Sequence, residues 1–522
     1  MSRDGTRQRR PVRWLATIGA FAVVAGPAVP GALWTPPVAY AAGAASTAHP
    51  PSASFEGGLW QASDWSSTAT ATKVSDIATM IGAPAGADGS GVGVALIDTG
   101  VVQVPGLPAT QVVNGPDLSF ESQGSTVRYL DTFGHGTHMA GIIMGNDPAA
   151  GFRGLAPGAK LTSVKVGTAQ GAVDVSQMIA AVDWVVAHRN DDPANPIRVI
   201  NLAYGSNSTQ PASIDPLSYA LENAWRHGIV VVVSGGNTGL LSSRLTNPAY
   251  DPFVLSVGSA STKGTAGYAD DELSLFSSVS TSRNVDLLAP GESIVSLRDP
   301  GSSIDKTFPI ARVGDRLFRG TGSSQATAVV SGAVALLLQQ RPNLTPDQVK
   351  ALLKSSATPL TVGKATSMRL GELNLGAALA KPTPAATQNY LAGFGVGSLE
   401  LGRGTVHVSR NGVPLLGEVD LFGPFNAAVW AQRTSAGTAW KGGVWMDHRM
   451  AGDGWTGTSW ASRTWAPATW SGSPWGGSAK WADDEWDTHY WTGTYWSGTY
   501  WSGTYWSGTY WSGDRWSGGY WR

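Results

Sequence analysis

The sequence predicts an α/β fold, a doubly wound and mostly parallel sheet with helices on both faces. Two observations lead to this prediction. Short apolar runs alternate with segments of helical periodicity between residues 91 and 379, and strands that alternate with helices form parallel sheets. The apolar runs are also continuous and bounded by glycines, as in Gly91–Gly100. Strands of that kind are buried on both faces, as in the middle of an α/β domain.

The individual elements follow from these patterns. Strands are expected at residues 91–100, 161–166, 198–203 and 229–233, with shorter apolar segments at 253–257 and 285–288. Helices are expected at 74–80 with Ser75 as the cap, from His135 through Ile143, and at 175–187, 214–227 and 320–340. A last helix starts at Thr345-Pro346-Asp347, which supplies an N-cap, a proline in the first turn and an acidic residue. Residues 370–379 close the domain.

The N-terminus is typical of an export signal. Five arginines precede an apolar run at residues 15–25, and Ala39-Tyr40-Ala41 is the predicted cleavage site. Residues 1–41 are therefore predicted to be a signal peptide, and the protein is predicted to be secreted or associated with the cell wall, without membrane contact after cleavage. Residues 42–87 are rich in small residues and are interpreted as a linker or a short pro-segment.

Composition excludes several function classes. The 522 residues carry a formal net charge of -1, which gives no electrostatic basis for nucleic-acid binding. There is no cysteine. Disulfide frameworks, thiolate catalysis and cysteine-dependent metal sites are therefore excluded.

Two separated blocks carry polar groups in positions suited to catalysis. Asp98 ends a predicted buried strand within Asp-Thr-Gly, and the carboxyl ends of such strands hold the chemistry of open α/β sheets. An aspartic peptidase would need a second Asp-Thr-Gly, and the chain has none. His135 lies between glycines, and His138 follows three residues later. No Glu stands between them and only Asp131 is a nearby acid, so a metal pair is disfavoured; His135 is expected to face a cleft and His138 the core.

A third block, Gly320–Gln340, places Ser323 and Ser324 before a long apolar helix pattern. Serine in that position usually caps the helix. The first turn of a helix also offers free N–H groups and a positive dipole end, which suit a nucleophile whose reaction develops an oxyanion. The block by itself leaves both interpretations open.

The three blocks in the order Asp98, His135, Ser324 closely resemble the subtilisin-like serine peptidases. Asp-Thr-Gly, His-Gly-Thr-His-x-Ala-Gly and Gly-Ser-Ser-x-Ala carry the resemblance, which covers residues 88–381. Matching Val330-Ser331-Gly332 to the family's Val-Ala-Gly places Ser324 at the nucleophile. Ala328 stands where the family usually has proline, and Gln325 also departs from the family pattern.

The resemblance implies a serine endopeptidase that acts on polypeptides. Ser324 would be the nucleophile, His135 the general base and Asp98 its orienting partner, and Asn237 in Gly-Gly-Asn-Thr-Gly would stabilise the oxyanion. Substrate would lie along the exposed edge at Ala203, Tyr204 and Gly205 and beside Gly235 and Gly236, which implies an apolar or aromatic residue before the scissile bond. No cofactor or metal is expected, since the loop 146–151 offers few oxygen ligands for calcium.

The C-terminal third has a different character. Residues 382–425 are predicted to be a linker with short strands, and residues 426–522 a tail in which tryptophan recurs every five residues from Trp455. Disorder, a short-pitch β solenoid and an adhesive tail that contacts the cell wall or glycans remain open. The tail is also a candidate substrate for removal by the enzyme itself. The alternative function for the whole chain is an inactive peptidase scaffold that presents this tail.

Overall fold

The computed structural model describes residues 71–449 except 123–126, 170, 172, 240–243, 281, 362–368, 406, 411–412, 421–422 and 442–443, and also residues 494–495, 500–501 and 504–505. The predicted signal peptide, residues 42–70 of the predicted linker and nearly all of the tryptophan repeat lie outside these residues. Among the described residues, no helix has both the length and the hydropathy that a membrane span requires.

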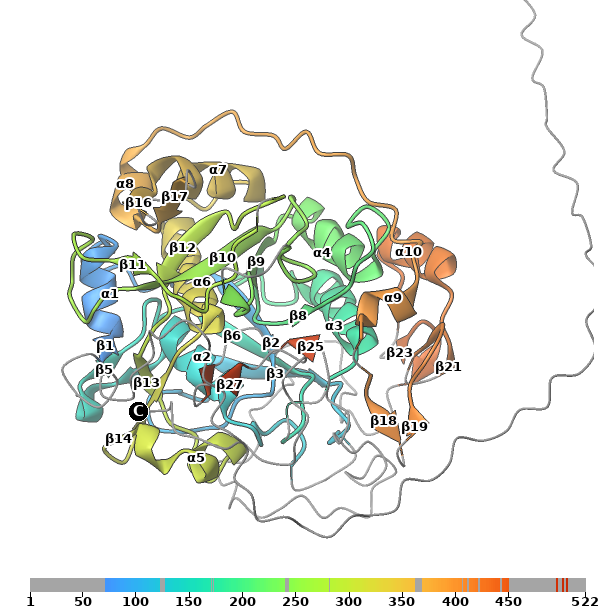
Figure 1. Cartoon of the computed structure of the whole chain (residues 1–522), viewed down its shortest axis with the longest axis horizontal. Coiled ribbons are helices and arrows are strands. Elements are labelled where there is room, and N and C mark those ends of the chain that lie inside the picture. Colours follow the sequence, from blue (N-terminus) through green and yellow to red (C-terminus); the bar gives the residue numbers. More distant parts are fainter. Residues whose placement is uncertain are drawn as a thin grey trace, which may run out of the picture. The chain divides into compact units, whose positions relative to one another are not determined.

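A mixed sheet forms the centre of the described chain (Figure 1). Its strand order is β16-β17-β12-β10-β9-β7-β2-β6-β3, and β11 pairs with β10. The strands are β2 (Gly93–Asp98), β3 (Val112–Asp117), β6 (Lys160–Lys165), β7 (Ile197–Leu202), β9 (Val230–Ser234), β10 (Leu255–Ser261), β11 (Glu272–Leu273), β12 (Leu287–Pro290), β16 (Thr358–Thr361) and β17 (Arg369–Glu372). The pairs β10–β11 and β16–β17 are antiparallel, and the others that are described run parallel. The predicted α/β fold is thereby confirmed.

Helices cover both faces of this sheet. Helices α2 (His135–Met144) and α6 (Ser323–Gln340) pack on each other against one face. Helices α3 (Val175–His188) and α4 (Pro216–Arg226) pack on each other against the other face. Every strand position in β2 and β9 is buried, as expected for a layer between two helical layers.

Three further helices lie at other edges of the fold. They are α1 (Val74–Met80), α7 (Pro346–Ser356) and α8 (Leu375–Ala380). The start of α7 is as predicted, because Thr345 caps it in a capping box with Gln348. The prediction of Ser75 as the cap of α1 is wrong, because the helix begins at Val74 and Lys73 occupies the N-cap position without a side-chain bond.

A smaller sheet leads into α6. It has the order β1-β13-β15-β14, formed by β1 (Thr72–Lys73), β13 (Ile294–Leu297), β14 (Arg312–Val313) and β15 (Leu317–Gly320). The short helix α5 (Ser303–Thr307) and the 3₁₀ turn Pro309–Ala311 lie between β13 and β14, and a second 3₁₀ turn, Pro148–Ala150, lies after α2. Strands β4 (Asn146–Asp147) and β5 (Phe152–Arg153) form a short pair after α2.

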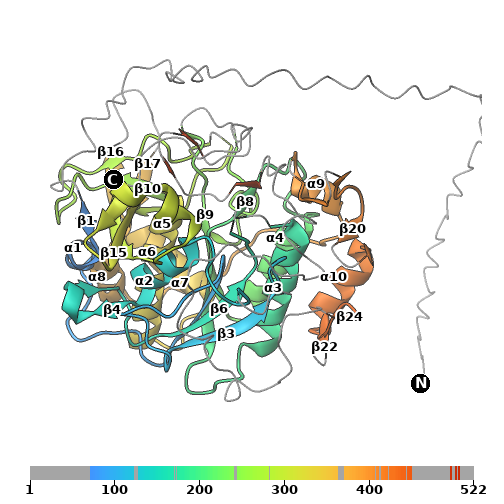
Figure 2. The same cartoon turned by 90° about the horizontal axis from the view of Figure 1, so that it is seen from below.

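Residues 399–449 form a small unit, here called the C-terminal module, on the outside of α3 and α4 (Figures 1 and 2). Its helices are α9 (Leu399–Arg403) and α10 (Ala427–Ser435). Its short strands are β18 (Ser409–Arg410), β19 (Val413–Pro414), β20 (Val419–Asp420), β21 (Gly423–Pro424), β22 (Trp440–Lys441), β23 (Val444–Trp445) and β24 (His448–Arg449). The expected short strands are present between 382 and 425, whereas the sequence patterns did not predict α9 and α10.

The tail contributes three short strands to the described residues. Strand β25 (Thr494–Tyr495) pairs antiparallel with β8 (Gly205–Ser206), and β26 (Tyr500–Trp501) pairs antiparallel with β27 (Thr504–Tyr505). The interpretations offered for the rest of the repeat concern residues outside the described part of the chain.

Candidate active site

The sequence-predicted residues gather at the carboxyl edge of the parallel strands. Asp98 is the last residue of β2, and Ser234 ends β9 just before Gly235 and Asn237. Strand β12 leads into Gly291, whose carbonyl accepts the Gly322 N–H at 2.7 Å and so holds the start of α6 at the same edge. This is the edge at which open α/β sheets keep their ligands.

Asp98 and His135 form a buried pair. Nδ1 of His135 lies 2.8 Å from Oδ1 and 3.0 Å from Oδ2 of Asp98, and the side chains are 0% and 1% exposed. His135 is the first residue of α2. The next residue, Gly136, lies against Gly100, since a Cβ on Gly136 would stand 2.0 Å from the Gly100 carbonyl oxygen. This close approach brings the helix start to the loop that follows Asp98.

A buried carboxylate behind this pair was not assigned a role from the sequence. Asp131 accepts hydrogen bonds at 2.7 Å from the hydroxyl of Thr99 and from the N–H groups of Gly134 and Thr137. The Thr99 N–H in turn donates to Asp98 at 2.8 Å. Burial raises the pKa of Asp131. Asp131 thus joins the first turn of α2 to the backbone beside Asp98. The only signal that the sequence offers for this residue is its spacing of four residues from His135.

The two serines of the third block are the first two residues of α6. The N-cap position belongs to Gly322, and no side chain caps the helix. The capping hypothesis for Ser323 and Ser324 is therefore wrong. Both serines are buried at the helix start, where the N–H groups of the first turn have no partner within the helix.

Asn237 is held against this helix start. Its Oδ1 accepts the N–H of Ser323 at 3.0 Å. Its Nδ2 is buried and has no hydrogen-bond partner among the described residues. The amide is therefore fixed through one end, and a donor remains available at the other. Gln325 also has a buried side-chain amide with no partner in the described part of the chain, although the sequence marked it only as a departure from the family.

His138 lies one turn into α2 and is buried, in line with the core position expected for it. Burial, followed by the proximity of His135, lowers the pKa of His138 to about 3. It is therefore neutral at physiological pH. No group of three or more His, Asp or Glu side chains with the geometry of a metal site occurs within the described residues.

The predicted substrate segments lie next to each other around Thr246. A Cβ on Gly205 would stand 2.6 Å from the Thr246 hydroxyl oxygen, and one on Gly236 would stand 3.1 Å from its methyl carbon. Gly235 accepts a bond from the same hydroxyl at 3.4 Å. Ala203 and Tyr204 are buried, and the edge at which substrate is expected is occupied by a strand of the chain's own tail, because β25 pairs with β8. Thr246 was not identified from the sequence, because its position depends on the fold.

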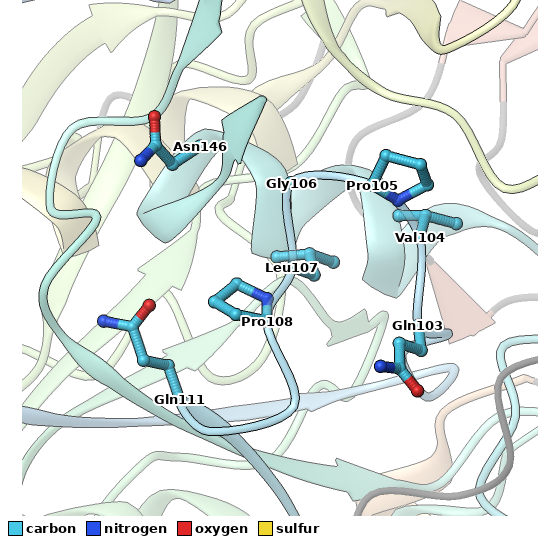
Figure 3. A pocket seen from close by; sticks show the side chains of 8 residues that line it. All are labelled: Gln103, Val104, Pro105, Gly106, Leu107, Pro108, Gln111 and Asn146. Carbon is cyan, nitrogen blue, oxygen red and sulfur yellow. The ribbon is translucent and has the colours of Figure 1, made fainter. Parts of the chain in front are cut away.

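A surface pocket of about 520 Å³ lies beside the loop that follows Asp98 (Figure 3). Residues 103–108, Gln111 and Asn146 line it, and none of these residues carries a titratable side chain. The adjacent Asp147 in the loop 146–151 is already paired, at 2.9 Å, with Arg316. This pocket therefore offers polar amides and no catalytic group.

Comparison with known proteins gives the class. The sequence profile of the Subtilase family matches residues 89–397, more than half of the chain. The chain belongs to the subtilase family.

Two curated relatives and one solved structure illustrate the likeness. The chain is 39% identical over 275 residues to the serine protease AprX of Bacillus subtilis (strain 168). This alignment covers 51% of this chain and 61% of AprX. It is 32% identical over 289 residues to the major intracellular serine protease of the same organism, covering 53% of this chain and 80% of that protein. A crystal structure of a cold adapted subtilisin-like serine proteinase matches with 30% identity and a TM-score of 0.43, covering 56% of this chain and 91% of that chain.

Proposed function

We propose that the chain is a secreted serine endopeptidase that hydrolyses peptide bonds through Ser324, His135 and Asp98. The observation that carries the proposal is the buried Asp98–His135 pair, with 2.8 Å between Oδ1 and Nδ1. In a triad the carboxylate selects the histidine tautomer that leaves Nε2 as the base. The similarity to proteins named as serine proteases supports the same activity.

In the proposed mechanism, Oγ of Ser324 attacks the peptide carbonyl while His135 Nε2 takes its proton. The C–N bond of the tetrahedral intermediate then breaks as His135 returns the proton to the leaving amine. Water, deprotonated by His135, then attacks the acyl carbon, the C–O bond to Ser324 breaks, and His135 returns the proton to Oγ of Ser324. Asp98 remains ionised and stabilises the imidazolium that forms in each half of the reaction.

Asn237 and the Ser324 N–H would stabilise the oxyanion. The available Nδ2 of Asn237, fixed by the bond from Ser323 to its Oδ1, is already oriented before substrate binds. Such preorganised donors need no reorganisation during reaction. Removing the equivalent side-chain donor in subtilisin lowers kcat by about 10²- to 10³-fold, and we expect a similar loss here in Asn237→Ala.

The experiment that tests the activity compares wild type with Ser324→Ala and Ser323→Ala. Each protein is assayed for casein hydrolysis and for covalent labelling by a serine-directed phosphonate. We expect labelling and hydrolysis to disappear in Ser324→Ala and to persist in Ser323→Ala. Labelling that instead depended on Ser323 would contradict the assignment. If wild type fails in both assays, the inactive scaffold with a glycan-binding tail becomes the better description.

Specificity is proposed to favour an apolar or aromatic residue before the scissile bond. Ala203, Tyr204, Gly205, Gly235 and Gly236 would bind the substrate backbone and border that pocket. These five positions carry no charge. A peptide library should therefore show cleavage mainly after Phe, Tyr, Leu or Met. A profile dominated by Lys or Arg would contradict this proposal.

A further inference from the structure

The C-terminal module borders the edge at which substrate is proposed to bind. The match to the subtilase family ends at residue 397, and the module begins with α9 at Leu399. Helix α9 lies next to β8 in both views of the structure (Figures 1 and 2). The module thus contacts the chain directly after the proposed substrate segment 203–205, although it lies outside the part of the chain that the family match covers.

One side of β8 is fixed within the peptidase fold, and the other side is available to an added strand. The N–H and carbonyl of Ser206 bond to the backbone of Asn247 at 2.8 and 2.9 Å. Successive residues of a strand direct their backbone groups to opposite edges, so Gly205 presents its N–H and carbonyl on the other side. The tail strand β25 pairs on that side. A substrate backbone that adds to this edge would pair there too.

Hydrogen bonds connect α9 and the residues after it to β8. The buried hydroxyl of Ser206 donates to the Gly402 carbonyl at 2.7 Å. Asn207 accepts the Thr405 N–H at 2.9 Å, and its Nδ2 donates to the Thr405 hydroxyl at 2.7 Å. The contact is close, since a Cβ on Gly404 would stand 2.0 Å from Oδ1 of Asn207. The module therefore holds the side chain of Ser206 and both ends of the Asn207 amide.

Helix α9 is in turn held by Arg403, its last residue. The side chain of Arg403 is 1% exposed, and its Nε donates to Asp174 at 2.6 Å. Its Nη1 donates to the Gly417 carbonyl at 2.8 Å. Asp174 is the N-cap of α3, so a buried ion pair fixes α9 to a helix of the central fold. Separating such a pair would leave an uncompensated buried charge, which is costly.

We propose that α9 clamps the substrate edge, and that Asn207 and Gly404 are positioning residues for the binding of extended peptides. This inference rests on the proposed peptidase function. A peptide that adds a strand to β8 binds more tightly when Gly205 is already in place, because ordering the edge during binding would reduce affinity. The module therefore acts on the binding of the substrate backbone and takes no part in the chemistry at Ser324.

Two substrates separate this role from a general effect on the fold. A tetrapeptide nitroanilide with Phe before the scissile bond can pair with β8, whereas acetyl-Phe nitroanilide is too short to do so. Asn207→Ala removes both bonds to Thr405, and Gly404→Ala places a methyl group against Asn207 from the module side. In each variant kcat/KM for the long substrate, divided by that for the short one, should fall by about 3- to 10-fold, mainly through KM.

This ratio is specific for the substrate edge. Competition by the tail strand and any disturbance at Ser324 affect both substrates alike, so they cancel. Thr434→Val is the matched control within the module. The Thr434 hydroxyl donates to Asp183 and accepts from Asn223 at 3.3 Å, on the side of the module that faces α3 and α4. The ratio should stay within about twofold of wild type in this control. An equal fall in Thr434→Val, or an unchanged ratio in both test variants, would overturn the clamp.

Hydrogen exchange tests the clamp without turnover. In the full chain carrying Ser324→Ala, protection of the amides at 203–207 should fall by about 3- to 10-fold in Asn207→Ala and in Gly404→Ala, with β9 as the internal reference. Thr434→Val should leave it unchanged. If wild type hydrolyses neither substrate, the peptidase assignment fails and exchange alone decides the clamp. Lost protection at 203–207 would then support it, and unchanged protection in both test variants would overturn it.

Discussion

At the scale of single residues, the proposed catalytic groups depend on a buried carboxylate behind them. His135 is the first residue of α2, so the position of its ring depends on the position of the first helical turn. Asp131 holds the turn through the N–H groups of Gly134 and Thr137, and it holds Thr99 beside Asp98. We interpret Asp131 as a positioning residue for the Asp98–His135 pair.

Replacing Asp131 by Asn should therefore lower kcat. One carboxylate oxygen becomes an NH₂ donor, which must face either an N–H group or the Thr99 hydroxyl. A small displacement of reacting groups can cost about 10²-fold in rate, so we expect kcat to fall by about 10- to 100-fold while KM changes by less than about threefold. Steady-state kinetics on an apolar peptide substrate measure both quantities.

Asp117→Asn is the matched control. Asp117 is equally buried and accepts bonds from Ser119 and from the Tyr129 N–H, but it has no bond to Thr99 or to α2. A general loss of stability would affect both variants alike. If Asp117→Asn lowered kcat as much as Asp131→Asn at equal folded fraction, the positioning role of Asp131 would have to be abandoned.

The sequence predicted the residues that stand at the ends of regular patterns. Asp98 ends an apolar run and His135 begins a helical one, so the periodicity of the sequence identifies both positions. Asp131 and Thr246 stand in loops, where no periodicity marks them. Their positions follow from bonds to backbone groups that only the folded chain brings close. The same limit explains the mistaken caps, since the start of a helix depends on the backbone angles of Lys73 and Gly322 rather than on the nearest serine.

At the scale of elements, the C-terminal module is attached to α3 through buried polar groups. Asp183 accepts bonds from Nε1 of Trp430 at 2.8 Å and of Trp445 at 2.9 Å, and also from the Thr434 hydroxyl. Arg403 is paired at 2.6 Å with Asp174, the N-cap of α3. The sequence indicates neither bond, because the partners of Asp183 are 247 and 262 residues away and lie in a region whose composition suggests a linker and a repeat.

Acidification should strengthen this attachment at Asp183. Burial raises the pKa of Asp183 to about 6 in the folded state, above the unfolded value of about 3.9. The folded protein therefore binds this proton more tightly, and the resulting stability is fully present below the unfolded pKa and lost as pH rises through 6. Between pH 7 and pH 4.5 the gain on acidification is about 2 kcal/mol.

Hydrogen exchange of the α10 amides measures this gain at both pH values, after correction for intrinsic rates. Protection in wild type relative to Asp183→Asn should be about 30-fold greater at pH 4.5 than at pH 7, because Asn does not titrate. The ratio also cancels the titration of distant groups such as Asp174. A ratio that stays constant with pH would show that burial of the Asp183 charge does not control docking of the module.

At the scale of the whole molecule, the chain brings its own tail to the proposed substrate edge. Thr494 pairs with Ser206 and Tyr495 pairs with Gly205, antiparallel to β8. A peptide that adds a strand in this way is bound through main-chain hydrogen bonds, so its register is set by the backbone. The repeat also supplies Tyr-Trp at every unit near this point, and aromatic residues match the specificity proposed for the enzyme.

The active enzyme should therefore cleave its own repeat. Purified wild-type protein is expected to lose mass from the C-terminus with time, giving fragments that end at Tyr or Trp of the repeat, whereas Ser324→Ala should retain Arg522. Cleavage within one molecule has an effective concentration set by the connecting chain, so the rate should not change over a tenfold range of protein concentration. Intact-mass spectrometry follows both variants. Wild-type protein that is active on casein could instead keep the same full mass as Ser324→Ala. The β8–β25 pairing would then not lead to cleavage, and the tail would be left with a role in binding.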